Sequence, residues 1–158
     1  MSNSVVNKGY ANYLKNYKQD IAASDKELLY ELIEKLVLLH GEERNMGEWY
    51  LPGSGEAFGG VKDYFHSTFP DMLIEDLLGF TASHEEKFSI HSLLPEDKWD
   101  YFYLGNLRYH GHDIDIIWKK DWSPEKEGDQ AKLCVWVDSQ LVSKTNSLNE
   151  KVTINLKD

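Results

Sequence analysis

Two histidines and two aspartates lie between positions 110 and 115, a spacing that could offer ligands to a divalent metal ion. His110 and His112 carry imidazole nitrogens, and Asp113 and Asp115 carry carboxylate oxygens, which zinc and related metals accept. Residues two apart on a strand share a face, so the histidines would point one way and the aspartates the other. Gly111 also favours a turn between the histidines. We therefore expect turn and solvated-strand residues and no metal or other cofactor, with a metal-dependent enzyme using His110 and His112 as an alternative.

Other catalytic patterns are weak. His84 is followed by Glu85 and Glu86 but lacks the second histidine of a HExxH helix, and no GxSxG motif frames a serine. Cys134 lies among apolar residues, where a thiol is usually inert packing. The sequence therefore favours a non-enzymatic protein.

The strongest candidate for binding is the segment 41–60, which contains six glycines and four glutamates. A long loop without regular structure is uncommon in a compact domain and often binds something. Exposed Trp and Tyr residues give contact area, and neighbouring carboxylates select a basic partner. The expected partner-binding residues are Glu42, Glu43, Glu48, Trp49 and Tyr50, followed by Asp113 and Asp115. The alternative is that Trp49 and Tyr50 anchor this loop on the core, as in a short strand.

The charge distribution supports a basic protein partner. The net charge is −10, and residues 41–100 hold four basic against thirteen acidic residues, a local charge of −9. Such a field repels phosphate backbones and anionic lipid, so direct binding of nucleic acid or membrane is not expected. The single cysteine indicates a reducing compartment, and neither a secretion signal nor a membrane span is visible. We expect a cytoplasmic protein.

The first half of the chain has helical periodicity. Residues 8–23 should form an amphipathic helix with a largely tyrosine buried stripe, and residues 24–40 a second one that packs against it in an antiparallel hairpin. Ser24 and Glu27 form a capping-box pattern, and Gly41 is the expected stop. A short helix around 61–69, another from Pro70 to Gly79 and a further turn around 84–94 should follow.

From Trp99 onward the apolar period changes to two. Strands are expected at 99–103, 107–109, 114–118 and 133–137, with an edge strand at 152–156 and a turn at 110–112. The predicted fold is α+β, with N-terminal helices packed on one face of a C-terminal antiparallel sheet. We expect residues 1–158 to form a single domain, with a helical part at about 8–94 and a sheet part at about 98–156.

These features favour an acidic protein-binding module of bacterial type. The specific hypothesis is an immunity or antitoxin-like inhibitor that masks the basic active site of a nuclease-type toxin, because its carboxylates would replace the phosphates. The alternative is a cone-shaped domain, like NTF2, that binds a small apolar ligand. That cavity would use Tyr101, Tyr103, His110, Asp115, Trp118 and Trp136. The oligomeric state and the identity of the partner stay open.

Overall fold

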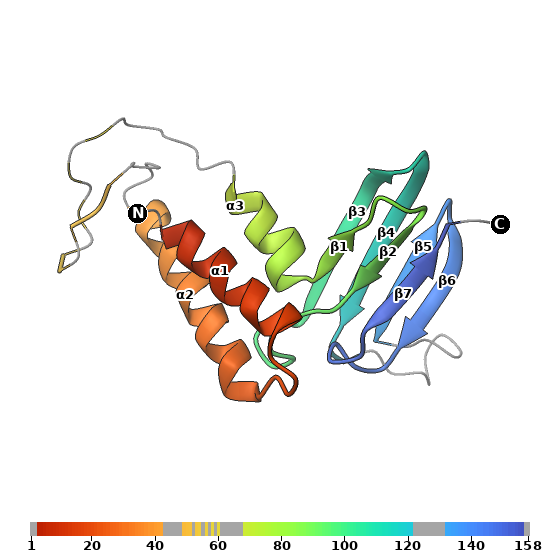
Figure 1. Cartoon of the computed structure of the whole chain (residues 1–158), viewed down its shortest axis with the longest axis horizontal. Helices are drawn as coiled ribbons and strands as arrows, with labels where there is room; N and C mark the ends of the chain where they lie inside the picture. Colours follow the sequence, from red (N-terminus) through yellow and green to blue (C-terminus); the bar gives the residue numbers. More distant parts are fainter. Residues whose placement is uncertain are drawn as a thin grey trace. The chain divides into compact units, whose positions relative to one another are not determined.

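The computed structural model describes residues 3–42, 49–51, 53, 54, 56, 58, 60, 68–121 and 132–156. These residues belong to two compact units, Met1–Asp76 and Leu77–Asp158. Figure 1 shows the helices of the first unit in red to yellow-green and the strands of the second in green to blue.

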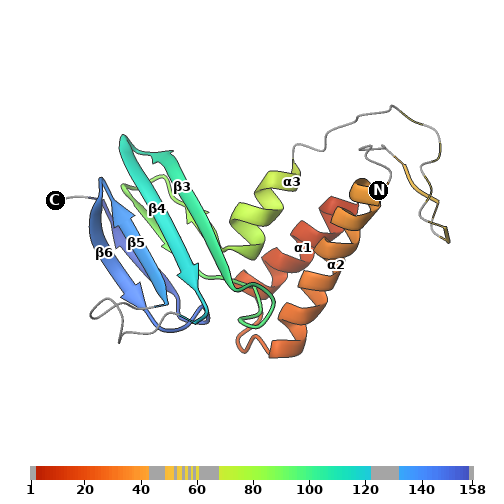
Figure 2. The same ribbon diagram turned by 180° about the vertical axis from the view of Figure 1, so that it is seen from behind.

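The first unit is built on a helical hairpin, as predicted. Helix α1 spans Asn3–Asn16 and helix α2 spans Ala23–Glu42, and the two lie side by side in both views (Figures 1 and 2). They run antiparallel, because Asn7 of α1 donates a hydrogen bond to the Leu32 carbonyl (3.3 Å) while the Tyr10 hydroxyl lies 3.5 Å from the Asp25 carboxylate. The later of the two α1 residues, Tyr10, thus contacts the earlier of the two α2 residues, Asp25, as in an antiparallel pair.

The buried stripe of α1 differs from the prediction. Asn7, Ala11 and Leu14 are buried, whereas Tyr13 and Tyr17 are exposed. The helix also ends at Asn16 rather than near residue 23. The Asn16 amide donates to the Asn12 carbonyl (3.3 Å), and such side-chain bonds to the backbone are common where a helix ends. The sequence predicted a buried stripe of tyrosines, but the buried positions of α1 are occupied by small, polar and aliphatic residues.

The start of α2 also differs from the prediction. The Asp25 carboxylate accepts a hydrogen bond from the Ala22 backbone N–H (2.8 Å), which is the back-reaching half of a capping box. Asp25 also forms an ion pair with Lys18 (2.5 Å), and both contacts lower the pKa of its carboxyl, the Lys18 bond most strongly. The cap therefore involves Ala22 and Asp25 instead of Ser24 and Glu27, and α2 continues past Gly41 to Glu42.

A third helical segment follows after residues that lie outside the described part. Helix α3 spans Thr68–Asp71 and continues as the π-helix η1, Met72–Leu77. Pro70 lies in the first turn, where its missing N–H has no helical partner to lose. The segment is followed by Gly79, whose φ of +88° and close approach to the backbone of His91 and Ser92 leave no room for a Cβ atom. The expected helix from Pro70 to Gly79 is thus present, although it starts at Thr68.

The second unit begins with a small sheet in a region where the sequence predicted a helical turn. Strand β1 spans Phe80–Ala82, β2 spans Lys87–Ile90 and β7 spans Val152–Asn155. All pairs are antiparallel, in the order β1-β2-β7. The expected helical turn around 84–94 and the limit of the helical part at about 94 are therefore wrong. Strand β7 is an edge strand, as predicted.

The remaining strands form a four-stranded antiparallel sheet in the order β3-β4-β5-β6. Strand β3 spans Tyr101–Tyr109, β4 spans His112–Lys119, β5 spans Leu133–Val137 and β6 spans Gln140–Thr145. The turn between β3 and β4 is tight, with positive φ at His110 (48°) and Gly111 (90°), as a two-residue hairpin requires. Two predicted strands, 99–103 and 107–109, are one strand with an irregularity between Leu104 and Leu107.

The two sheets of the second unit enclose one apolar core. The Tyr109 ring of β3 packs edge-on against Phe80 (5.5 Å between centroids) and Phe88 (6.0 Å), which come from the smaller sheet. Figures 1 and 2 show the sheets as two facing layers. The largest fully buried side chains of this core are Phe88, Ile90, Leu93, Leu94, Ile114, Trp118, Leu133 and Leu148. Burial of each contributes roughly 1.5–3 kcal/mol.

The α+β class is confirmed, with helices in the N-terminal part and antiparallel sheets in the C-terminal part. There are two sheets where the sequence predicted one. Among the helices of the described residues, none has the length and apolar character needed to cross a membrane.

Candidate functional site

One face of the four-stranded sheet points away from the core, and we call it the outer face. Strand pairing fixes its members, because paired residues share a face. Phe102 pairs with the fully buried Trp118, so the neighbouring pairs, Tyr101 with Lys119 and Tyr103 with Ile117, point outward. The outer face contains Tyr101, Tyr103, Arg108, Asp113, Asp115, Ile117, Lys119, Cys134, Trp136, Leu141 and Lys144. Tyr101 and Tyr103 are 68% and 57% exposed, so two aromatic rings of edge strand β3 are open to solvent.

The Tyr103 ring lies flat over its own strand. A Cβ atom built on Gly105 would overlap Cζ, Oη and Cε1 of Tyr103, so the ring covers the glycine directly. The irregularity of β3 is centred here, and Asn106 has a φ of 56°, as a β-bulge residue can. A side chain at position 105 would displace the ring. Glycine is therefore what allows Tyr103 to lie along the strand.

Asp115 fixes the end of that ring. The Tyr103 hydroxyl donates a hydrogen bond to Asp115 Oδ1 (2.9 Å), and the Asn106 backbone N–H donates to the same oxygen (3.0 Å). The hydrogen bond to the carboxylate raises the pKa of the Tyr103 phenol. The ring is thus held at both its face and its hydroxyl, while its second face stays open.

The turn end of the outer face carries an ion-pair network. Arg108 Nη1 lies 2.8 Å from Asp113 Oδ1, and His112 Nδ1 lies 2.7 Å from Asp138 Oδ2. Two further hydrogen bonds join Asp113 and Asp138: the Asp113 N–H donates to the side-chain Oδ1 of Asp138 (3.0 Å), and the Asp138 N–H donates to the Asp113 carbonyl (2.8 Å). Two hydrogen bonds lower the pKa of the Asp138 carboxyl: the bond from the Asp113 backbone has the larger effect, and the bond from His112 follows. This network joins the β3–β4 and β5–β6 hairpins.

The two histidines of the sequence hypothesis do not converge. His110 Nε2 lies 3.2 Å from the Ser83 carbonyl oxygen, whereas His112 faces Asp138. Within the described residues, no group of three or more His, Cys, Asp or Glu side chains is placed to hold a metal ion. The aspartates lie on the outer face, as the alternation of the strand predicted.

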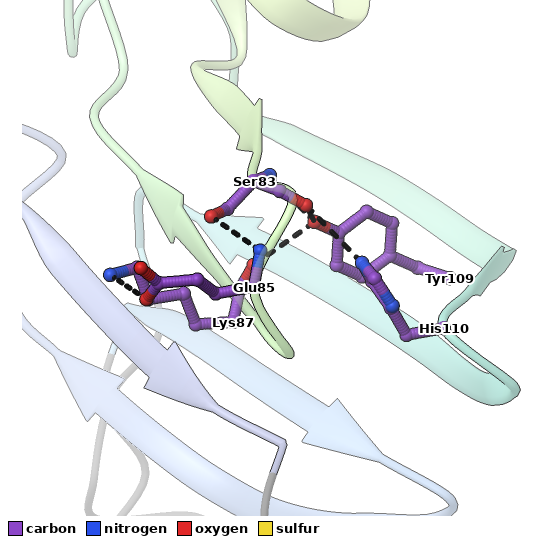
Figure 3. A network of polar contacts seen from close by, with 5 residues as sticks. All are labelled: Ser83, Glu85, Lys87, Tyr109 and His110. Carbon is purple, nitrogen blue, oxygen red and sulfur yellow. Dashed lines mark hydrogen bonds and ion pairs between the residues drawn. The ribbon is translucent and has the colours of Figure 1, made fainter.

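Beside His110, a polar network ties the two sheets together (Figure 3). The Tyr109 hydroxyl accepts a hydrogen bond from the Ser83 N–H (2.7 Å) and lies within donating distance of the carbonyls of Ser83 (2.8 Å) and Lys87 (3.0 Å). The Ser83 hydroxyl accepts from the Glu85 N–H (3.1 Å), and Glu85 forms an ion pair with Lys87 (2.5 Å). The network holds the β1–β2 turn against the end of β3 and has a structural role.

A second charged cluster lies in the helical unit. Lys8 Nζ lies 3.1 Å from Glu75 Oε2 and 3.8 Å from Asp76 Oδ2, and Lys15 Nζ donates to the Glu75 carbonyl. Asp76 Oδ2 is buried and accepts no hydrogen bond from the part of the chain that the structure describes, and burial raises the pKa of this carboxyl. Burial lowers the pKa of Lys15. Shifted pairs of this kind occur both in active sites and in structural networks. Here the cluster fastens η1 to α1.

The predicted binding loop is described only in part. Glu42 is the last residue of α2, with no description of its side chain, and Glu43 and Glu48 lie outside the described residues. Trp49 is 57% exposed and Tyr50 is half-buried. The Phe58 N–H donates to the Trp49 carbonyl and the Leu51 N–H to the Glu56 carbonyl, both at 2.9 Å. Trp49 therefore belongs to a short antiparallel ladder, and Phe58 is 61% exposed.

The residues of the hypothetical ligand cavity do not share a face. Tyr101, Tyr103, Asp115 and Trp136 belong to the outer face, whereas Trp118 is fully buried on the opposite one. Trp118 Nε1 has no hydrogen-bond partner among the described residues, and the Lys132 ammonium lies 6.0 Å from the ring centroid.

A solved structure titled "Sialidase" is similar to this chain. The TM-score is 0.81 and the sequence identity is 26%, over 95% of this chain and 14% of that one. The chain thus spans about a seventh of the length of the sialidase that it matches. A scan against protein-family models finds no match.

The sequence carries one signal for the Tyr103 site. An isolated glycine in a strand pattern, followed by asparagine, indicates a bulge. Gly105 and Asn106 have that pattern between two alternating apolar runs. This pattern indicates the bulge, whereas the pinned orientation of the Tyr103 ring also needs Asp115 from the neighbouring strand.

Proposed function

We propose that this chain is an accessory unit for carbohydrate recognition, of the kind that accompanies a sialidase-type activity. The observation that carries the proposal is the structural match to a segment of a protein titled "Sialidase", which covers 95% of this chain at 26% identity. Because the chain spans 14% of that protein, the proposal concerns binding and not the hydrolysis named in its title.

The geometry of the second unit is compatible with this role. Sugars bind through stacking on open aromatic rings and hydrogen bonds to nearby polar groups, and a few fixed polar groups give orientation. The outer face offers two exposed tyrosines and the carboxylate of Asp115. The pinned Tyr103 loses little freedom when a ligand binds, which lowers the entropic cost of association.

The test separates binding from turnover. The full chain is passed over columns that carry immobilised neutral or sialylated oligosaccharides, and it is incubated separately with a fluorogenic sialoside. We expect retention on at least one oligosaccharide column and release of fluorophore no faster than in buffer. No retention on any column would refute the carbohydrate proposal, and sialoside hydrolysis would refute the accessory assignment.

The acidic protein-binding hypothesis is a second candidate, and the exposed Trp49 and Phe58 favour it. Large apolar side chains open to solvent are common in interfaces, and the chain carries a net charge of −10. In this proposal the protein acts in the cytoplasm, avoids nucleic acid and masks a basic toxin-like partner through Trp49, Tyr50 and the neighbouring glutamates.

A pull-down from host lysate at low and moderate salt tests this second candidate. A stoichiometric basic partner should be retained by the natural chain and lost with Trp49→Ala. Tyr17→Ala is the matched control, because Tyr17 is an exposed aromatic residue outside the loop. The absence of a basic partner, or its equal retention by Trp49→Ala, would contradict this candidate.

A further inference from the structure

We infer that the open face of the Tyr103 ring is a stacking platform for a neutral pyranose, an assignment that rests on the carbohydrate function proposed above. The inference starts from the pose of the ring. Its lower face covers Gly105, its hydroxyl is bonded to Asp115 Oδ1 at 2.9 Å, and 57% of the side chain remains exposed. A ring held in this way presents one flat π-face to solvent.

A pyranose fits the chemistry of such a face. The face of an aromatic ring is electron-rich and attracts groups with positive edges, and one side of a pyranose carries several C–H hydrogens of that character. The sugar hydroxyls then need acceptors beside the ring. Asp115 provides one, because both hydrogen bonds described for its carboxylate go to Oδ1, leaving Oδ2 beside the ring.

The row of aromatic groups continues along β3. Tyr101 lies on the same face, two residues away, a separation of roughly 7 Å along a strand. It is 68% exposed, so a second sugar unit can contact it. The platform therefore suits an oligosaccharide that runs along the edge of the sheet.

The charges beside Tyr103 favour a neutral sugar over an acidic one. The only cations that share the outer face on β3 and β4, within the described residues, are Arg108, which is bound to Asp113, and Lys119, which lies beside Tyr101. No described cation lies within ion-pair distance of Asp115. A sialic acid carboxylate placed over Tyr103 would therefore face an uncompensated negative charge, in a chain of net charge −10.

The experiment compares matched sugars and matched variants of the full chain by isothermal titration calorimetry. Lactose and 3′-sialyllactose differ by one sialic acid, and a panel of glucose, mannose and galactose oligosaccharides extends the neutral arm. We expect a neutral member of the panel to bind, at least tenfold weaker binding with Tyr103→Ala, and a smaller loss with Tyr103→Phe, which keeps the ring but removes its hydrogen bond to Asp115. Asp115→Asn should improve binding of 3′-sialyllactose. Tyr17→Ala is the control, because it removes an exposed tyrosine that follows the last residue of α1.

Amide chemical shifts of the natural chain provide a second measurement that needs no variant to fold. The neutral ligand should shift the amides of Tyr103, Gly105 and Asn106. Equal affinity of Tyr103→Ala, or shifts confined to other strands, would overturn the platform while leaving carbohydrate binding intact. Tighter binding of 3′-sialyllactose than of lactose would overturn the neutral assignment. No binding of any sugar would refute the proposed function itself, and the platform with it.

Discussion

Replacing Tyr109 with phenylalanine tests how the two sheets of the second unit are held together. The variant removes one oxygen atom and keeps the ring that packs against Phe80 and Phe88. The missing hydroxyl leaves the Ser83 N–H without the acceptor that it has at 2.7 Å. It also removes the donor that faces the carbonyls of Ser83 and Lys87.

The expected cost follows from these unpaired groups. Leaving a buried donor or acceptor without a partner costs about 1–3 kcal/mol, and the upper part of that range applies to fully buried groups. The groups around Tyr109 are partly buried. We therefore expect the free energy of unfolding to fall by about 2 kcal/mol.

Urea unfolding followed by tryptophan fluorescence measures this loss, and hydrogen exchange at the Ser83 amide locates it. Tyr103→Phe is the matched control: it removes a hydroxyl from the exposed outer face and should cost less. A loss below about 0.5 kcal/mol for Tyr109→Phe, the range of ordinary surface changes, would refute the account of this tie. Equal losses in the two variants would do the same.

Three further predictions concern backbone strain and pH. Gly79→Ala should destabilise the protein by more than about 3 kcal/mol, because the new Cβ atom would overlap the backbone of His91 and Ser92. Gly111→Ala should cost only about 1 kcal/mol, because its Cβ atom adds positive-φ strain but lies in open space. Equal shifts of the two urea midpoints would contradict this. Burial raises the pKa of Asp76, so ionisation of Asp76 destabilises the fold as pH rises through the folded pKa. Asp76→Asn should therefore gain stability relative to the natural chain as pH rises above the ordinary aspartate pKa of about 4, and a pH-independent difference in melting temperature would contradict this. The pKa of Asp138 is lowered in the folded protein, so the ionised carboxylate stabilises the fold above the ordinary aspartate pKa, and this contribution is lost as pH falls through the folded value. The loss of unfolding free energy in Asp138→Asn should therefore shrink below about pH 4. A loss that persists in acid would be evidence against the His112 network.

The sequence predicted the elements whose pattern is strong and local. Ile114, Ile116 and Trp118 alternate with Asp113, Asp115 and Ile117, and all three are buried in β4. The helical hairpin and the turn at His110 and Gly111 were predictable for the same reason. Strands β1 and β2 were missed because they are short and flank a polar turn, and because β2 also pairs with β7, more than 60 residues later. A single short segment carries no information about such a distant partner.

The candidate site was less predictable than the fold. The alternation of β3 places Tyr101 and Tyr103 on one face, yet nothing in the period indicates that the Tyr103 ring folds back over Gly105. That pose depends on a bulge and on Asp115 from the neighbouring strand. Strand β6 was missed as well, because its hairpin turns at Asp138 and Ser139, with φ of 49° and 66°, instead of at a glycine.

A glycan microarray probed with the labelled full chain tests the central claim, carbohydrate binding through the outer face, most directly. Each neutral glycan is printed beside its sialylated counterpart, and Tyr103→Ala is probed in parallel. The account predicts signal on a set of neutral glycans, weaker signal on the sialylated partners, and loss of both with the variant. An array without signal above background, or one on which the variant gives the same pattern as the natural chain, would contradict it.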